Sequence, residues 1–215
     1  MHILVLLAGL TGAKMALAET PAGAASKPIK MVVLGDSLSA GLGLSATAAF
    51  PDQLKKSLET KGIAVDMINA GVSGDTASGG RDRLDWSVPE GTEAVIVELG
   101  ANDALRGIDP AVTRAALADI LTRLKARNIA VLLCGMLAPP NYGSDYAARF
   151  NAIYPDLATS FGVPLYPFFL EGVAAQAKLN QADGIHPTAE GVDVIVRNIL
   201  PRVEAWLGTI SGQRR

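Results

Sequence analysis

Short runs of apolar residues alternate along this chain with longer segments of helical periodicity, and this alternation restricts the fold more than any other feature. Four runs are typical of buried strands: Ile29–Leu34, Ala64–Ile68, Ala94–Leu99 and Ile129–Cys134. Helical patterns cover Phe50–Thr60, a segment around Ala77–Leu84, Thr113–Arg127, Asp145–Phe161 and Ala189–Leu207. The alternation predicts an α/β fold in which helices cover both faces of a parallel sheet.

Two of the predicted helices contain an internal proline, Pro155 in one and Pro201 in the other. A proline within a helix removes one backbone hydrogen bond and collides with the preceding turn. We therefore expect a kink or a restart of the helix at each of these positions.

Length and composition indicate one packed domain and exclude some kinds of site. The chain has 215 residues, of which 49% are hydrophobic and 19% are charged, as in a soluble globular domain. Its 19 Lys and Arg against 21 Asp and Glu leave a net charge of −2, which argues against nucleic acid as a partner. A single cysteine, Cys134, permits no intramolecular disulfide. The only histidines, His2 and His186, are too few for a zinc site built from several Cys and His ligands.

The first residues have the order of a secretory leader. The apolar run Ile3–Leu10 is far shorter than the roughly 20 residues that span a bilayer, and the small-residue pattern Ala16-Leu17-Ala18 follows it. We predict a signal peptide over residues 1–18, a linker over 19–29 and a single domain over 30–215. Because no Lys or Arg precedes the run and Lys14 follows it, an ordinary N-terminal helix is the alternative. The leader implies a periplasmic or secreted protein, and because Glu19 rather than a cysteine directly follows Ala18, a lipoprotein anchor is not expected.

The first polar segment, Gly35-Asp36-Ser37-Leu38-Ser39, follows the first predicted strand. Active sites of parallel sheets gather at the carboxyl ends of the strands, and a serine at a strand-to-helix turn can present its hydroxyl above the sheet edge. Ser and Asp are also common helix N-caps, which is the structural alternative. A phosphate-binding loop is disfavoured because no G-x-x-x-x-G-K-[ST] pattern follows.

Two further polar segments, Asn69–Thr76 and Gly100–Asp103, follow the second and third predicted strands. In the first, Gly71 lets the backbone approach a ligand and offer its N–H, although a turn that caps the next helix is an alternative. In the second, the amide of Asn102 could donate to an oxyanion or bridge backbone groups of its own loop.

The last polar segment, Asp183-Gly184-Ile185-His186-Pro187, precedes the final helix. A carboxylate three residues before a histidine is within reach to orient its ring, while a turn aspartate and a helix-starting proline are the structural alternatives. Since His2 lies in the predicted leader, His186 is the only base for a Ser–His mechanism. The chain order Ser, Asp, His is one of the known orders of that constellation.

Taken in order, these segments resemble the four sequence blocks of the GDSL or SGNH hydrolases, which are serine esterases. The matching residues are Gly35-Asp36-Ser37-Leu38, Gly71 within Asn69–Thr76, Gly100-x-Asn102-Asp103 and Asp183-x-x-His186-Pro187, and the resemblance spans about residues 30–205. Asn102–Gly107 and Pro139–Gly143, followed by Tyr146 and Phe150, are similar to the secreted bacterial arylesterases, thioesterases and lysophospholipases. The resemblance implies a three-layer α/β/α sandwich, flavodoxin-like, with about five parallel strands.

The resemblance also implies the chemistry of a carboxylic ester hydrolase. Ser37 would be the nucleophile, His186 the base that takes its proton, and Asp183 the group that orients the imidazole. The backbone N–H groups of Ser37 and Gly71 and the side chain of Asn102 would bind the oxyanion. This mechanism needs no metal and no organic cofactor, and its partner is a small-molecule ester.

Apolar residues in the loops after two strand ends are expected to border the cleft and to cover an acyl chain: Leu105, Ile108, Pro140 and Tyr142. The expected substrates are aryl and short- to medium-chain acyl esters, with acyl thioesters and lysophospholipids as further members of the class. A carbohydrate O-acetylesterase is the alternative enzyme. A non-catalytic binding protein on the same fold is the alternative from another class.

Other conspicuous residues are interpreted as structural. Cys134 lies inside an apolar run and is expected in the core, and Trp86 and Trp206 are expected to be packing residues. Glu98, at the end of an apolar strand, is interpreted as a hydrogen-bonded residue near the site, and Asp36 as a brace of its turn.

Overall fold

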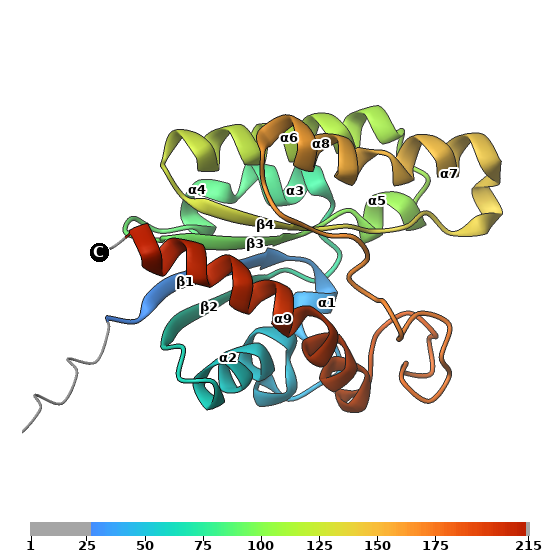
Figure 1. Cartoon of the computed structure of the whole chain (residues 1–215). Coiled ribbons are helices and arrows are strands. Elements are labelled where there is room, and N and C mark those ends of the chain that lie inside the picture. The colour runs from blue at the N-terminus through green and yellow to red at the C-terminus, as the bar shows by residue number, and fades with distance from the viewer. Residues whose placement is uncertain (1–26, 214–215) are drawn as a thin grey trace, which may run out of the picture.

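The structure, a computed structural model, describes residues 27–213. A single sheet of five parallel strands has the order β2-β1-β3-β4-β5. The strands are β1 (Ile29–Gly35), β2 (Val65–Gly71), β3 (Ala94–Glu98), β4 (Ala130–Cys134) and β5 (Leu165–Tyr166). Helices lie on both sides of the sheet (Figure 1), so the predicted three-layer α/β/α sandwich is confirmed.

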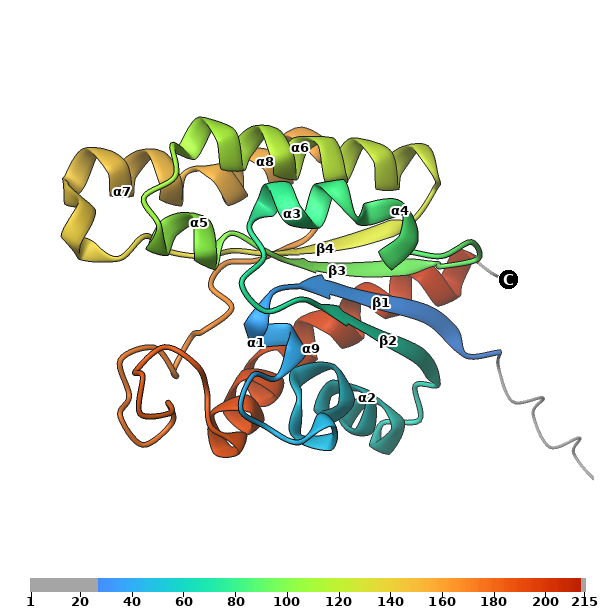
Figure 2. The same cartoon turned by 180° about the vertical axis from the view of Figure 1, so that it is seen from behind.

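The two helical layers differ in size. On one side lie α1 (Ser37–Ala40), α2 (Phe50–Thr60) and α9 (Ala189–Gln213). On the other side lie α3 (Ala77–Asp82), α4 (Leu84–Ser87), α5 (Ala101–Leu105), α6 (Pro110–Ala126), α7 (Gly143–Asn151) and α8 (Ile153–Phe161), as the view from behind also shows (Figure 2). Two short 3-10 turns, η1 (Ala46–Ala48) and η2 (Pro140–Tyr142), lie in loops.

The strands follow from the apolar runs because the middle of the sheet is covered on both faces. Every residue of β3 is buried, and so are all residues of β1 except Lys30. A strand buried on both faces has a continuous apolar sequence instead of an alternating one. The four predicted strands are all present, and the second continues beyond Ile68 to Gly71. The fifth, with only two half-buried residues, is too short to produce a periodic pattern.

The two internal prolines have different outcomes. The predicted helix over 145–161 is two helices, α7 and α8, which meet at Ala152, and this confirms the expected restart near Pro155. By contrast, α9 is one helix that continues through Pro201, so the helix does not restart there. The carbonyl that loses its bond to Pro201 belongs to Arg197, which lies on the exposed side of α9 where water can bind it.

The interpretation of the tryptophans was correct for only one of them. Trp206 is buried in the core against the sheet, whereas the side chain of Trp86 on α4 is 81% exposed. Residues 1–18, the predicted leader, lie outside the described residues, and Ile29 at the end of the predicted linker is the first residue of β1. Within residues 27–213, no helix is both long and apolar enough to cross a membrane.

The strand order fixes where a site can form. From β1 the chain passes to β2 on one side and returns to β3 on the other side of β1. The loops after β1 and β3 therefore diverge, and ligands of such sheets bind in the crevice at this point. In Figure 1, α1, α5 and the long loop after β5 all lie at this end of the sheet.

Candidate active site

Ser37 is the first residue of α1, and a single residue, Asp36, separates it from the end of β1. Asp36 precedes it as the N-cap, and its Oδ1 accepts the N–H of Leu38 at 2.9 Å. This cap begins the helix at Ser37. The serine is only 7% exposed, and it lines the cavity described below.

A continuous chain of hydrogen bonds joins Ser37 to two residues far along the sequence. Nε2 of His186 lies 2.9 Å from Oγ of Ser37, and Nδ1 of His186 lies 2.6 Å from Oδ2 of Asp183. The other carboxylate oxygen, Oδ1, accepts the N–H groups of Ile185 at 2.9 Å and of His186 at 3.0 Å. The structure thus brings together the serine, histidine and aspartate that the sequence singled out.

Hydrogen bonds also fix the charge on Asp183. The N–H of Ile185, followed by the side chain and the N–H of His186, lowers the pKa of Asp183 to about 2. An ionised carboxylate accepts the Nδ1–H of the ring, which leaves Nε2 with a lone pair directed at Ser37.

Gln181 holds the loop of His186 against the loop that follows α1. Its N–H donates to the carbonyl of His186 at 2.7 Å. Its side-chain Nε2 donates to the carbonyl oxygens of Leu42 at 2.7 Å and of Pro187 at 2.9 Å. These bonds tie the loop that carries His186 to the segment that follows Ser37, although the two residues are far apart in the chain.

Asn102, the second residue of α5, presents its amide beside the serine turn. Its Nδ2 donates to Oδ2 of Asp36 at 3.2 Å and to the carbonyl oxygen of Asp75 at 3.0 Å. Asp36 is the neighbour of Ser37, and Asp75 is the neighbour of Gly74. One amide therefore joins the segment of the serine to the glycine-containing loop after β2, and Asn102 also lines the cavity.

The structure does not support Gly71 as a donor to the oxyanion. Its N–H donates to Oδ1 of Asn69 at 2.9 Å and is already satisfied. A Cβ at this position would lie 2.3 Å from the backbone nitrogen of Ala40. Gly71 is a glycine because β2 ends against the backbone of α1, and this close packing corrects the role that the sequence assigned to it.

Gly74, three residues later in the loop after β2, has the properties that Gly71 lacks. Its φ is +85°, a conformation that favours glycine. Among the described residues nothing accepts a hydrogen bond from its N–H, and the same holds for the N–H of Ser37. The sequence alone cannot show which of the two glycines offers a free N–H. That depends on the side chain of Asn69, which accepts the N–H of Gly71.

Two buried carboxyl groups lie beneath the serine turn. Oε2 of Glu98 accepts the hydroxyl of Ser39 at 2.6 Å and the N–H of Asp36 at 3.4 Å. Burial is the main cause that raises the pKa of Glu98 well above its usual value and the pKa of Asp36 to about 6. The structural roles expected for these residues agree with these contacts, since both brace the turn that carries Ser37.

A cavity of about 670 Å³ opens beside Ser37 and His186, a size typical of small-molecule sites. Its walls are mostly apolar and come from the loops after β1, β3 and β4 and from the segment 168–186. Leu105 and Pro140 are among the lining residues, as expected from the sequence.

Ile108 and Tyr142 are not among the lining residues, which corrects their predicted place. The hydroxyl of Tyr142 donates to the carbonyl oxygen of Leu105 at 2.7 Å, and the carbonyl of Ile108 accepts the hydroxyl of Tyr146 at 2.9 Å. Tyr142 thus holds the end of α5 that carries Leu105, and Tyr146 holds the segment of Ile108 that follows it. A tyrosine turned toward the neighbouring backbone cannot be distinguished in sequence from one turned toward the cleft.

Arg83 holds the ends of β1 and β2 together, a role that no local sequence pattern indicates. Its guanidinium donates to the carbonyl oxygens of Gly35 and Ala70, both at 2.8 Å, and pairs with the carboxylate of Asp75. An arginine inside a helical segment gives no signal of such contacts.

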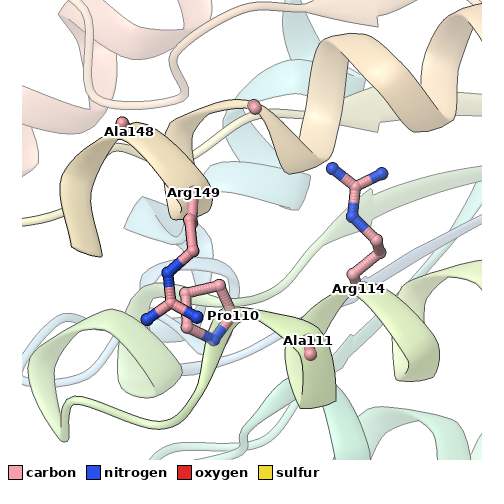
Figure 3. A pocket seen from close by; sticks show the side chains of 6 residues that line it. Pro110, Ala111, Arg114, Ala148 and Arg149 are labelled. Carbon is pink, nitrogen blue, oxygen red and sulfur yellow. The ribbon is translucent and has the colours of Figure 1, made fainter. Parts of the chain in front are cut away.

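A second hollow, of about 490 Å³, lies between α6 and α7 and reaches Ala152, which follows α7 (Figure 3). Its two charged side chains are already paired: Arg149 with Asp109 at 3.2 Å, and Arg114 with Asp156 at 2.6 Å. None of its lining residues is shared with the cavity at Ser37. Within the part of the chain that the structure describes, no cluster of three or more His, Cys, Asp or Glu residues could hold a metal ion.

Comparison with known proteins finds similar sequences along most of the chain. The thioesterase 1/protease 1/lysophospholipase L1 of Escherichia coli K12 is 44% identical over 82% of this chain and 80% of its own length. Esterase TesA of Pseudomonas aeruginosa is 39% identical over 82% of this chain and 89% of its own length.

Solved structures give the same result for the fold. A crystal structure of TesA covers 82% of this chain and 99% of its own, with 38% identity and a TM-score of 0.78. The psychrotrophic esterase EstA from Pseudoalteromonas sp. covers 84% and 99%, with 29% identity and a TM-score of 0.79. The model of the GDSL-like lipase/acylhydrolase family matches residues 33–194, and the chain therefore belongs to that family.

Proposed function

We propose that this protein is a serine esterase that hydrolyses carboxylic esters through an acyl-enzyme. The observation that carries the proposal is the hydrogen-bonded series Asp183, His186 and Ser37 at the wall of an apolar cavity. A serine hydroxyl is a weak nucleophile unless a base is within hydrogen-bonding distance. The esterase names of the relatives support the same chemistry.

In the first half of the reaction, Oγ of Ser37 attacks the acyl carbonyl carbon while its proton passes to Nε2 of His186. Asp183 stabilises the imidazolium that forms and keeps the ring in the required tautomer. The tetrahedral intermediate then collapses, the imidazolium gives its proton to the leaving oxygen, and the alcohol or phenol departs.

The negative charge that develops on the carbonyl oxygen needs donors that are already in place. We assign them to the N–H groups of Ser37 and Gly74 and to Nδ2 of Asn102, with Gly74 in place of Gly71. The two N–H groups have no acceptor among the described residues, and Asn102 lies between the two segments that carry them. Nδ2 of Asn102 already has two acceptors, so the oxyanion would share one of its hydrogens.

In the second half, His186 takes a proton from water, and the water oxygen attacks the acyl-enzyme. The same donors bind the second oxyanion. Release of the carboxylic acid restores the hydroxyl of Ser37 and the neutral imidazole. This sequence needs only the protein's own residues and a small-molecule ester.

The proposed substrates are aryl esters and short- to medium-chain acyl esters, because the cavity is mostly apolar. Acyl thioesters and lysophospholipids are included because the names of the Escherichia coli relative include them. The alternative enzyme, a carbohydrate O-acetylesterase, is less well supported, because an acetyl group is too small to contact most of this apolar wall. We also propose the signal peptide over 1–18 and a periplasmic or secreted location, which the pattern Ile3–Leu10 followed by Ala16-Leu17-Ala18 supports.

The decisive test combines labelling with turnover. Ser37→Ala should remain folded, lose labelling by a fluorophosphonate and lose about 10⁴-fold or more in kcat for an aryl ester, because triad residues act as a unit. Ser144→Ala, at an exposed position of α7, is the matched control and should keep both. A wild-type protein that neither labels nor turns over esters would instead be a binding protein on this fold.

A further inference from the structure

Arg106 is a charged residue beside the site that the proposed mechanism does not use. It follows α5 directly, one residue after the cavity-lining Leu105. Its Nη2 donates to the carbonyl oxygen of Gly74 at 2.8 Å and to Oδ1 of Asn102 at 3.4 Å. In residues 27–213 it takes part in none of the ion pairs, although its side chain is exposed. Its only hydrogen-bond acceptors there thus belong to Gly74 and Asn102, two of the three residues whose N–H groups are assigned to the oxyanion.

The bond to Asn102 determines which end of the amide can face the substrate. Only the Nδ2 end of an asparagine can donate, and an isolated amide can rotate its two ends past each other. A guanidinium at Oδ1 favours one orientation, because the rotated amide would place N–H groups against N–H groups. The contacts of Nδ2 with Asp36 and Asp75 favour the same orientation from the opposite end.

The bond to Gly74 fixes the second donor relative to the first. Gly74 lies in a loop with a left-handed φ of +85°, and a Cβ added to it would meet only Nη2 of Arg106, at 3.6 Å. The next residue, Asp75, is held from other directions, because its carboxylate pairs with Arg83 and its carbonyl oxygen accepts Nδ2 of Asn102. Arg106 therefore connects the loop after β2 to α5, so that the N–H of Gly74 and Nδ2 of Asn102 keep a constant separation.

The positive charge adds an electronic effect to this geometry. A cationic donor on the carbonyl oxygen of an amide withdraws electron density and strengthens the donor at its nitrogen. The benefit grows as negative charge develops on the substrate, so it lowers the barrier more than it strengthens ground-state binding.

We propose that Arg106 is a positioning residue that holds Asn102 and Gly74 in the arrangement that binds the oxyanion, an inference that rests on the proposed esterase function. Arg106→Gln is expected to lower kcat for p-nitrophenyl butyrate by about 10- to 100-fold, less than the roughly 10²- to 10³-fold loss of an oxyanion donor. KM should change by less than about threefold, since the contact acts in the transition state. Arg106→Lys should recover part of the lost kcat, because an ammonium group keeps the positive charge but lacks the planar set of donors of a guanidinium.

A double-mutant cycle tests whether Arg106 acts through Asn102. In an Asn102→Ala background, Arg106→Gln should cost much less than it costs in the wild type, because the side chain it positions is gone. Arg149→Gln, at an exposed ion-paired arginine of α7, is the control and should leave kcat unchanged. Millimolar guanidinium should restore part of the kcat of Arg106→Ala and none of that of Asn102→Ala.

Two outcomes would overturn the inference while the esterase function stands: full kcat in Arg106→Gln, or losses that multiply independently in the cycle. A rise in KM at constant kcat would make Arg106 a substrate-binding group and would equally overturn it. A wild-type protein without esterase turnover would be a failure of the proposed function, which the same assay reports separately.

Discussion

Gly71, at the end of β2, and Gly74, in the loop that follows, show how two nearby residues of the same type have separate tasks. The first allows contact between two backbones, and the second exposes an N–H. A Cβ at Gly71 would lie 2.3 Å from the nitrogen of Ala40, whereas the space at Gly74 is open except for Arg106. The two positions should therefore respond differently to the same substitution.

Gly71→Ala should mainly reduce stability, by about 1–3 kcal/mol or more, because the backbone of α1 must move. Gly74→Ala should reduce stability by only about 1–2 kcal/mol, the strain of alanine in a left-handed conformation, but should lower kcat at least about tenfold. Thermal unfolding and steady-state kinetics on both variants check this. Full kcat in Gly74→Ala would remove Gly74 from the oxyanion site.

Asp36 gives a pH dependence of stability that can be derived from its burial. Burial raises its pKa from 3.8 to about 6, so between these values the unfolded chain ionises while the folded protein holds its proton. The folded state is then stabilised at low pH and loses about 3 kcal/mol as the pH rises from about 4 to above 6. Asp36→Asn should show a shallower decrease in urea midpoint over this range, part of which remains because Glu98 is also buried. Parallel curves for the two proteins would contradict this assignment.

At this scale the sequence could predict the residues whose chemistry has no substitute. The family resemblance implied the triad, and counting agreed with it, because only one histidine lies outside the predicted leader and it stands three residues from Asp183. The roles of Gly74, Arg83 and Arg106 could not be predicted, because each depends on which backbone group a distant segment leaves free. Hydrogen-bond partners of this kind are a property of the fold, not of a local pattern.

At the scale of elements, burial decides whether a helix tolerates an unfavourable residue. The face of α9 toward the sheet contains Ile195, Ile199, Val203 and Trp206, all buried. This packing stabilises the helix enough to carry Pro201 through its middle, where proline is less favourable than alanine by about 3 kcal/mol. The restart at Ala152 is different, because there the chain can separate into two helices of nine residues that pack independently.

Pro201→Ala should stabilise the protein, by at most about 3 kcal/mol, because it supplies an N–H for the carbonyl of Arg197 and removes the steric conflict. For a domain of this length the midpoint of thermal unfolding should rise by about 2–4 °C per kcal/mol. Pro201 lies on α9, away from the cavity residues, so kcat should stay constant. A lower midpoint would mean that the helix is bent at Pro201 and packed in that shape.

Length explains which elements the sequence could predict. The four apolar runs form strands at or close to their predicted positions, because strands of five to seven residues are long enough to give a clear signal, even in the edge strand β2, where only Val65 is buried. The two residues of β5 gave none, and its place at the sheet edge comes from pairing with Leu133 and Cys134. The prediction for Trp86 was wrong because it assumed that a large aromatic residue is buried. Trp86 lies on the four-residue helix α4, and its side chain is exposed to solvent.

For the whole molecule, the cavity is the feature that joins distant parts of the chain. Its lining comes from Ser37 and Leu38 near one end, from the loops after β3 and β4, and from the segment 168–186 near the other. No local pattern contains such a surface, which explains why two of the four predicted lining residues were misplaced. Leu105 and Pro140 line the cavity, while Tyr142 bonds to the carbonyl oxygen of Leu105 and the carbonyl oxygen of Ile108 accepts a hydroxyl.

The cavity predicts how turnover depends on the length of the acyl chain. Each methylene that moves from water to an apolar wall contributes about 0.8 kcal/mol, and the part realised in the transition state raises kcat/KM. We expect kcat/KM to increase from acetyl to medium-chain p-nitrophenyl esters. Leu105→Ala should flatten this increase while sparing the acetyl ester, because Leu105 lines the cavity and is itself 43% exposed.

Ile108→Ala is the matched control, since Ile108 lies three residues from Leu105 but not on the cavity wall. It should keep the slope of kcat/KM against chain length, even where it lowers the midpoint of thermal unfolding slightly. If both variants flatten the slope equally, the preference for acyl-chain length depends on the whole segment 105–108 and not on the cavity wall at Leu105. If the wild type prefers acetyl to every longer chain, the alternative of a carbohydrate O-acetylesterase gains support. The series of Ser37, His186 and Asp183 would serve that reaction equally well, because the nucleophile and its base do not depend on the length of the acyl group.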